Sequence, residues 1–251
     1  MIWRKASKMI GRIFKPNTLD FETAIWEIFH LIINPKKMYR SHYYYRHQNG
    51  VNGLNYTRDD PLFLILLTGF LTVSSVAWGL AYSPKVVDIL KLIVYSVFVD
   101  FYLTGAVVAT ISWVLANKVL FRNSGSRYSV NYIDWWFCFD IHCNSFLVIW
   151  CLLYLLQFLL LPILVVKNSI FGLLLGNLLY YVAVSYYFIV TFYGFSSLPF
   201  LTAQTSNNSK PAKTLQIIIL GVVLPLLTVV WLLATLFGVN IANLMVDAYF
   251  N

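Results

Sequence analysis

The chain has 251 residues, of which 59% are hydrophobic and only 11% are charged. A soluble domain usually carries about 25% charged residues, so this composition excludes an ordinary soluble protein. Several apolar stretches exceed the ~18 residues that indicate a membrane-spanning helix. The sequence therefore predicts an all-α, polytopic membrane protein.

The net charge of +8 is concentrated in residues 1–61, which hold ten of the eighteen Lys and Arg residues but only five of the ten acids. A basic segment beside a membrane favours anionic lipid headgroups, at roughly 1 kcal/mol per basic residue near the surface. We therefore expect residues 1–61 to form a basic, amphipathic cytosolic tail, and residues 62–251 to form the transmembrane domain.

Residues 2–14 have helical periodicity, with apolar side chains on one side of the helix. The basic residues on the other side are Arg4, Lys5, Lys8, Arg12 and Lys15. This pattern favours a helix lying in the lipid headgroup layer, and a helix packed on a partner protein is the alternative. A second amphipathic helix is expected from Thr18 to Ile33. Its three acids make it a poor candidate for a membrane span.

Tyrosines alternate with basic residues between Lys36 and His47. Such a segment could stack on RNA bases while neutralising phosphates, but its composition is also that of a membrane-interface anchor. Its position beside a membrane domain favours the anchor and leaves RNA binding open. The charged residues Arg58, Asp59 and Asp60 precede Pro61 and mark the entry to the first span.

Five membrane spans are expected, at about residues 62–82, 89–116, 145–166, 170–192 and 215–237. The amino-terminal tail and the two long connections hold fifteen Lys and Arg residues, whereas the opposite side holds three. Because basic residues concentrate on the cytosolic side of membrane proteins, the amino terminus is expected in the cytosol and the carboxyl terminus in the lumen.

A polar group at the expected start of the third span comprises Asp140, His142 and Asn144. Asp is a favoured helix N-cap, so we expect Asp140 to cap this span and the group to shape a docking face. Asp140 and Asn144 are four residues apart and can share a helix face as a hydrogen-bonding pair. A structural zinc site needs about four ligands, and no second His or Cys pair is present. No catalytic or phosphate-binding motif is found either, so we expect neither an enzyme nor a cofactor.

Asp100 and Asn177 are polar residues inside expected spans. A carboxylate in a membrane usually faces the helix bundle and has a partner, for which Asn177, Thr104 and Asn117 are candidates. A proton path would need several ionisable groups, so a hydrogen-bonded carboxyl that fixes helix register is favoured.

Six short motifs occur in order along the chain. They are Asp20-Phe21-Glu22-x-Ala24-x-Trp26, Pro35-x-x-x-Tyr39-Arg40, Arg58-Asp59-Asp60-Pro61-x-Phe63, Phe139-Asp140-Ile141-His142-x-Asn144-x-Phe146, Gly176-Asn177 and Tyr193-Gly194-Phe195-Ser196-x-Leu198-Pro199-Phe200-Leu201. Together they resemble the uncoordinated-fifty family of Golgi membrane proteins over about residues 18–240.

This resemblance implies a five-span Golgi protein that acts in vesicle traffic and receptor delivery and associates with large Arf guanine-nucleotide exchange factors. It implies no catalytic residue, and RNA binding has also been attributed to the family. Our interpretation is a non-enzymatic membrane scaffold for such an exchange factor, with cargo receptors as further partners. The alternatives are a small proton-coupled transporter or lipid-handling protein using Asp100, Asp140 and His142, and an RNA-binding membrane protein.

Overall fold

The computed structural model describes residues 11, 19–48, 60–82, 85–120, 132–164, 166, 169–198 and 211–250. These residues form helices, and none of those described lies in a strand, which confirms the all-α fold class. Apart from Gly11, the helix expected over residues 2–14 lies outside the described residues.

Five helical runs are long and apolar enough to cross a membrane, as expected. Their bounds are Leu62–Tyr82, Val86–Lys118, Trp135–Leu164, Ile170–Ser196 and Ala212–Leu236. The first span has the predicted bounds, and the second and fourth are longer than predicted. The largest difference is in the third span, which begins at Trp135 instead of Ser145.

The first and fourth spans are the continuous helices α4 (Leu62–Tyr82) and α9 (Ile170–Ser196), whereas the other three contain π-helical segments. The second span consists of α5 (Val86–Val94), η2 (Tyr95–Leu103), α6 (Thr104–Leu115) and η3 (Ala116–Leu120). The third consists of α7 (Trp135–Ile149), η4 (Trp150–Leu156) and α8 (Gln157–Leu164). The fifth consists of α11 (Pro211–Gln216), η5 (Ile217–Val223) and α12 (Leu224–Leu236). Because π-helical turns are rare and often mark functional sites, η2 and η4 are candidate functional segments.

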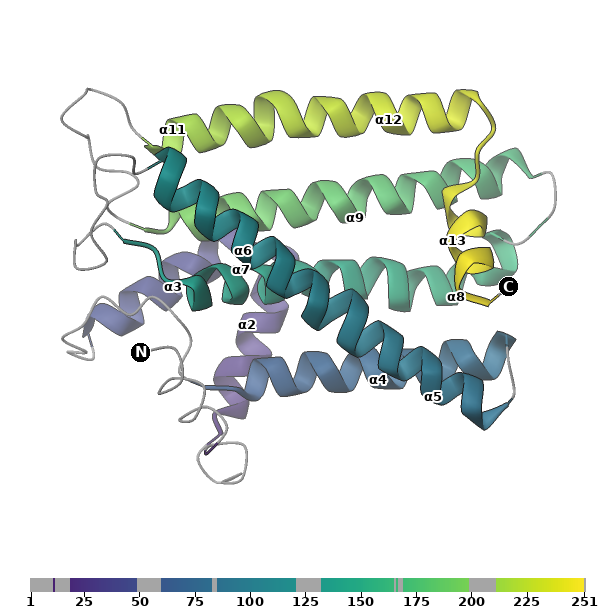
Figure 1. Ribbon diagram of the computed structural model, residues 1–251, viewed down its shortest axis with the longest axis horizontal. Coiled ribbons are helices and arrows are strands. Elements are labelled where there is room, and N and C mark those ends of the chain that lie inside the picture. The colour runs from purple at the N-terminus through teal and green to yellow at the C-terminus, as the bar shows by residue number, and fades with distance from the viewer. Residues whose placement is uncertain are drawn as a thin grey trace.

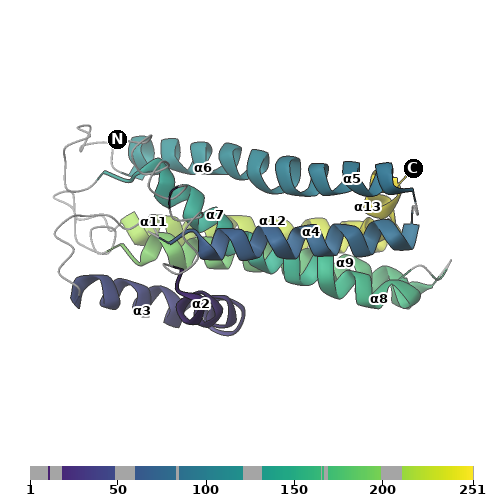
Figure 2. The same ribbon diagram turned by 90° about the horizontal axis from the view of Figure 1, so that it is seen from below.

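The spans run side by side along the long axis of the molecule (Figures 1 and 2), with two helices outside the bundle near one end. Helix α2 (Phe21–Ile33) crosses the spans, and α3 (Pro35–Gln48) leads away from it. α2 begins three residues later than expected, because Asp20 caps it. It ends before Asn34, whose side-chain oxygen accepts a hydrogen bond from the Lys37 backbone N–H (3.1 Å) at the start of α3.

The largest hydrophobic core joins α2 and α3 to the spans. Leu31 and Met38 from these two helices pack with Phe63, Phe101 and Leu147 from the first three spans. All five side chains are at most 1% exposed. The α2–α3 pair is therefore a packed part of the domain.

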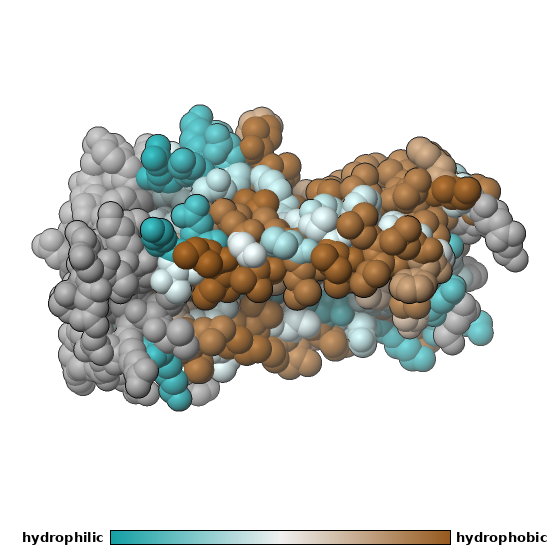
Figure 3. Space-filling model, turned by 90° about the horizontal axis from the view of Figure 1, so that it is seen from above, coloured by the Kyte–Doolittle hydropathy of each residue, from teal (hydrophilic) through white to brown (hydrophobic). Residues whose placement is uncertain are grey.

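On the face shown in Figure 3, apolar side chains cover most of the surface of the spans, and hydrophilic residues lie near both ends. The exposed apolar surface continues onto α2, where Phe21, Ile25 and Phe29 are more than half exposed. A helix that crosses the spans and exposes apolar side chains has the character of a helix lying in the membrane interface.

A further helix, α13 (Ile241–Phe250), follows the fifth span and was not expected from the sequence. Gly238 has a φ of 70°, a left-handed conformation that glycine adopts at helix ends. The chain reverses there, and the Asn240 side chain accepts a hydrogen bond from the Asn243 backbone N–H (3.1 Å) to begin α13. The helix then lies across the spans at the end opposite α3 (Figure 1).

Candidate functional site

Two carboxylates, from Asp20 and Asp60, lie at the beginning of α2 and of the first span, and that of Asp60 joins the two. The Asp60 side chain accepts hydrogen bonds from the backbone N–H groups of Asp20 (2.9 Å) and Leu62 (3.0 Å). Asp20 in turn accepts bonds from the Thr23 backbone N–H (3.1 Å) and hydroxyl (2.5 Å). Asp60 therefore connects two helix starts that are forty residues apart in sequence, whereas Arg58 and Asp59 lie outside the described residues.

The pKa of the Asp20 carboxyl is lowered from its ordinary value, first by the Thr23 hydroxyl and then by the Thr23 backbone N–H. Both groups donate to the carboxylate, and hydrogen bonds to the charged form favour it. The N-cap of α2 therefore depends on the ionised form of Asp20.

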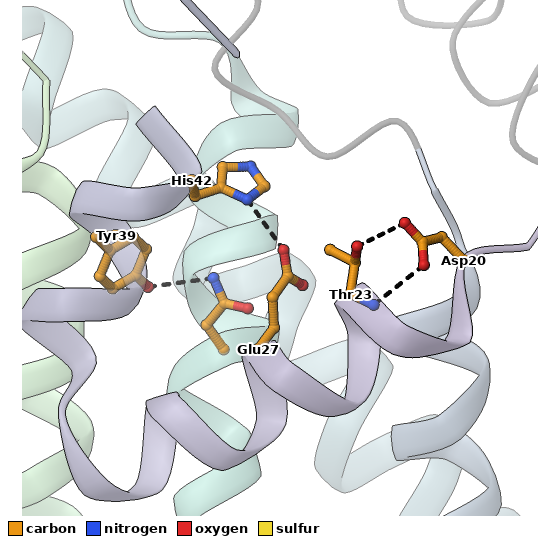
Figure 4. Close-up of polar contacts among 6 residues, drawn as sticks. Asp20, Thr23, Glu27, Tyr39 and His42 are labelled. Atoms are coloured by element: carbon orange, nitrogen blue, oxygen red, sulfur yellow. Dashed lines mark hydrogen bonds and ion pairs between the residues drawn. The ribbon is translucent and has the colours of Figure 1, made fainter. Parts of the chain in front are cut away.

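Three polar contacts hold the α2–α3 pair together and against the bundle. Glu27 is 4% exposed and pairs with His42 Nδ1 at 3.0 Å, which joins α2 to α3 (Figure 4). The Asn144 amide donates to the Tyr39 hydroxyl at 3.2 Å, which joins α7 to α3. The Tyr186 hydroxyl on α9 donates to the Ile32 carbonyl at 2.8 Å. These contacts fix the orientation of α3 relative to the spans.

The structure contradicts the expectation that Asp140 caps the third span. The helix begins at Trp135 with Asp134 at the N-cap position, so Asp140 lies well inside α7. Hydropathy misplaced this boundary, because the polar residues that follow face other helices instead of lipid. Asp134 directly before an aromatic helical run was the N-cap signal that could have located it.

His142 and Asn144 are buried within helix contacts, at 3% and 2% exposure, and each bonds to a different element. His142 Nδ1 lies 2.8 Å from the Tyr187 hydroxyl on α9, and Asn144 bonds Tyr39 as described. Asp140 is partly exposed on α7. The expected polar cluster is therefore divided: Asn144 belongs to the α3 attachment, and His142 belongs to the α7–α9 contact.

The partners expected for Asp100 were wrong. Its Oδ2 accepts hydrogen bonds from the hydroxyls of Tyr154 (2.9 Å) and Tyr249 (2.6 Å), and Tyr249 belongs to the unexpected helix α13. Asn177 instead binds the chain before α13, and Asn117 binds Ile133. The Thr104 hydroxyl donates to the backbone carbonyls of Asp100 and Phe101, and not to the Asp100 side chain.

No group of three or more His, Cys, Asp or Glu side chains that could hold a metal is found among the described residues. Cys138, Cys143 and Cys151 form no disulfide with one another; the first two are buried, and Cys151 is partly buried. The candidate functional site is the surface of α2 and α3, because these helices join the polar end of the molecule to the spans. This α2–α3 surface is defined by Asp20, Glu27, Lys36, Lys37, Tyr39, Arg40, His42 and Asp60.

Five apolar spans, with two amphipathic helices anchored across one end, define a multi-pass helical membrane protein. The family model described as "UNC-50 family" matches residues 9–250, and this chain belongs to that family, as its motifs predicted.

Similar proteins occur in fungi, amoebae and animals. Protein GMH1 of Saccharomyces cerevisiae is 44% identical over 205 residues, covering 77% of this chain and 72% of that protein. The Protein unc-50 homolog of Dictyostelium discoideum is 38% identical over 192 residues (76% and 71%), and that of Homo sapiens is 34% identical over 197 residues (78% and 73%). No solved structure matches this chain.

Proposed function

We propose that this protein is a non-enzymatic Golgi membrane protein that acts in vesicle-mediated protein transport and receptor trafficking. In this proposal the α2–α3 end faces the cytosol, the carboxyl terminus is lumenal, and the α2–α3 surface binds a large Arf guanine-nucleotide exchange factor. Cargo receptors are a second class of partner. Membership of the UNC-50 family and the distribution of basic residues support this reading.

The observation that carries the docking role is the two-sided character of α3. Its Met38 and Tyr39 side chains are buried against the spans, whereas Lys36, Lys37 and Arg40 are exposed. The Glu27–His42 pair and the Tyr39–Asn144 bond hold the helix in this orientation. A partner therefore meets basic groups whose positions are fixed, which lowers the ordering cost of binding.

The two alternatives gain no support from these contacts. A proton relay through Asp100 and His142 would need both residues in one hydrogen-bond network. Asp100 bonds to Tyr154 and Tyr249, whereas His142 bonds to Tyr187. RNA stacking needs accessible aromatic rings, and Tyr39, the first tyrosine of the segment considered, is 8% exposed.

Direct binding of a purified large Arf exchange factor to the full chain in lipid nanodiscs tests the proposal. Reversing the charges of Lys36, Lys37 and Arg40 to Glu is expected to weaken binding about tenfold or more, since removing complementary charge and adding repulsion both oppose association. The matched control reverses Lys85 and Lys91 at the opposite end of the second span.

Binding that is weakened equally by both sets of substitutions would contradict a specific α3 surface. Unchanged binding in the α3 variant, with the helical content and thermal stability of the natural chain, would also overturn the docking role. A loss confined to the α3 variant is the expected result.

A further inference from the structure

A cavity of about 260 Å³ lies between four spans and the carboxyl-terminal helix, and it is partly open to the surface of the transmembrane domain. Asp100 of η2, Tyr154 of η4 and Tyr249 of α13 line it, together with the apolar side chains of Leu153 and Met245. It is separate from the α2–α3 surface. Two of its lining residues, Asp100 and Tyr249, are 149 positions apart in sequence.

One oxygen of Asp100 is left for a ligand. Both tyrosine hydroxyls, from Tyr154 and Tyr249, donate to Oδ2, and Oδ1 makes no hydrogen bond to any residue that the structure describes. A carboxyl group at membrane depth is costly unless its hydrogen-bonding capacity is used. An incoming hydroxyl group could bond to Oδ1 without displacing either tyrosine.

The backbone around the cavity is specialised to bring these groups together. Asp100 and Tyr154 both lie in π-helical segments, η2 and η4, and such segments frequently occur at functional sites. Tyr249 is brought to the same carboxylate by α13, whose amino-terminal end is held by the Asn177 side chain on α9. Three independent features therefore converge on one carboxyl group.

The size and position of the cavity restrict the ligand. Its volume exceeds the ~150 Å³ cavity that holds benzene but is below the ~300–1,000 Å³ of pockets for drug-sized molecules, so it fits one ring system or part of one hydrocarbon chain. Asp100 lies near the middle of the second span. A charged or zwitterionic headgroup is costly at that depth, whereas a neutral molecule with one small polar group is not excluded.

We propose that this cavity binds a neutral lipid alcohol, whose hydroxyl bonds to Asp100 Oδ1 and whose hydrocarbon part lies against Leu153 and Met245. A hydroxyl both donates and accepts hydrogen bonds, so it matches a carboxyl group in either protonation state. Sterols and diacylglycerols share this chemistry, and the experiment separates them.

The test uses the purified full chain in nanodiscs with two photoreactive probes, a sterol and a diacylglycerol, each compared with its methyl ether. Cross-linked peptides are located by mass spectrometry. Because the ether cannot donate a hydrogen bond, the hydroxyl form of the true ligand class is expected to label α13 or the third span about fivefold more than its ether. The probe that labels the protein more strongly, sterol or diacylglycerol, identifies the class of lipid alcohol that binds.

Met245→Trp fills the cavity without changing Asp100 or either tyrosine, and is expected to reduce labelling about fivefold or more. Val230→Trp on the exposed surface of α12 is the matched control and is expected to keep it. Asp100→Leu is expected to bring the hydroxyl probe down to the level of its ether.

Equal labelling by the hydroxyl and ether forms of both probes in the natural chain would overturn the proposal, and this comparison requires no variant to fold. Labelling that persists in a folded Met245→Trp protein would overturn it as well. Neither result would affect exchange-factor binding at α3.

Discussion

Asn177 is fully buried in α9 and uses both ends of its side-chain amide on the chain that precedes α13. Its Nδ2 donates to the Val239 carbonyl (2.8 Å), and its Oδ1 accepts from the Ile241 backbone N–H (2.9 Å). These two hydrogen bonds satisfy backbone groups at a chain reversal. Such groups are costly to leave unpaired in a membrane.

Asn177→Ala is therefore expected to detach α13, and with it the Tyr249–Asp100 contact. Leaving buried backbone groups unpaired costs roughly 1–3 kcal/mol each. Hydrogen exchange of residues 241–250 should accelerate while the spans stay protected. Asn243→Ala changes an amide on α13 outside this pair of bonds and serves as the control. Unchanged exchange in Asn177→Ala would show that other contacts hold α13.

Gly105 allows α6 to approach the His142 ring on α7 closely. A Cβ added at Gly105 would lie 2.6 Å from His142 Cδ2, whereas nothing lies within 4 Å of one added at Gly69. Overpacking a close helix contact typically costs ~1–3 kcal/mol. We expect Gly105→Ala to destabilise the protein, and Gly69→Ala to be neutral or stabilising by up to ~1 kcal/mol through helix propensity.

Reversible unfolding in mixed detergent micelles measures both variants. Adding His142→Ala to Gly105→Ala should recover part of the loss, since the clashing ring is then absent and residues in contact are energetically coupled. If the losses of stability from the two substitutions simply add, the cost of Gly105→Ala does not arise from contact with the His142 ring.

At the scale of helices, the Asp20 N-cap makes the first turn of α2 sensitive to acid. The Thr23 hydrogen bonds lower the pKa of Asp20, so the stabilisation is present above the ordinary Asp pKa of about 3.9 and is lost as pH falls through the lower, folded-state value. Below that range we expect faster hydrogen exchange in the first turn of α2, after correction for intrinsic rates. Asp20→Asn, which still caps helices, should remove this Asp20-dependent change. An identical acid response in Asp20→Asn would contradict the assignment.

Some helix boundaries followed directly from local sequence, and others depended on packing. The first span was predicted correctly, because Pro61 precedes a mostly apolar run that contains no charged residue. The start of the third span was missed because His142 and Asn144 lower its hydropathy, although both are buried between helices. α13 was missed because its ten residues are too few for a span, even though Gly238 and Asn240 marked its start.

The candidate site was likewise predictable only in part from local sequence. The sequence placed Asp60 at the entry to the first span, and it identified Asp100, His142, Asn144 and Asn177 as polar groups at or inside the spans, where polar side chains are costly. It did not identify Tyr39, Tyr154 or Tyr249 as their partners, which come from segments distant in the chain. Pairings of this kind depend on tertiary packing, and hydropathy carries no information about them.

At the scale of the whole molecule, the location of α3 makes the proposed orientation testable with single cysteines. Lys36 on α3 and Lys85 before α5 are both exposed and lie at opposite ends of the spans. In a background with Cys138, Cys143 and Cys151 replaced by Ser or Ala, Lys36→Cys and Lys85→Cys each provide one accessible thiol. A membrane-impermeant maleimide applied to sealed, right-side-out Golgi vesicles reaches only the cytosolic side.

We expect Lys36→Cys to be labelled in sealed vesicles and Lys85→Cys to be labelled only after detergent opens them. The reason is the excess of Lys and Arg at the α3 end, which retains that end in the cytosol during insertion. Lys213→Cys, in the first turn of the fifth span, should behave like Lys36→Cys, because four membrane crossings return the chain to the same side. Labelling of Lys85→Cys in sealed vesicles, without labelling of the other two, would reverse the topology. It would also place the α3 basic surface in the lumen, where a cytosolic exchange factor could not reach it.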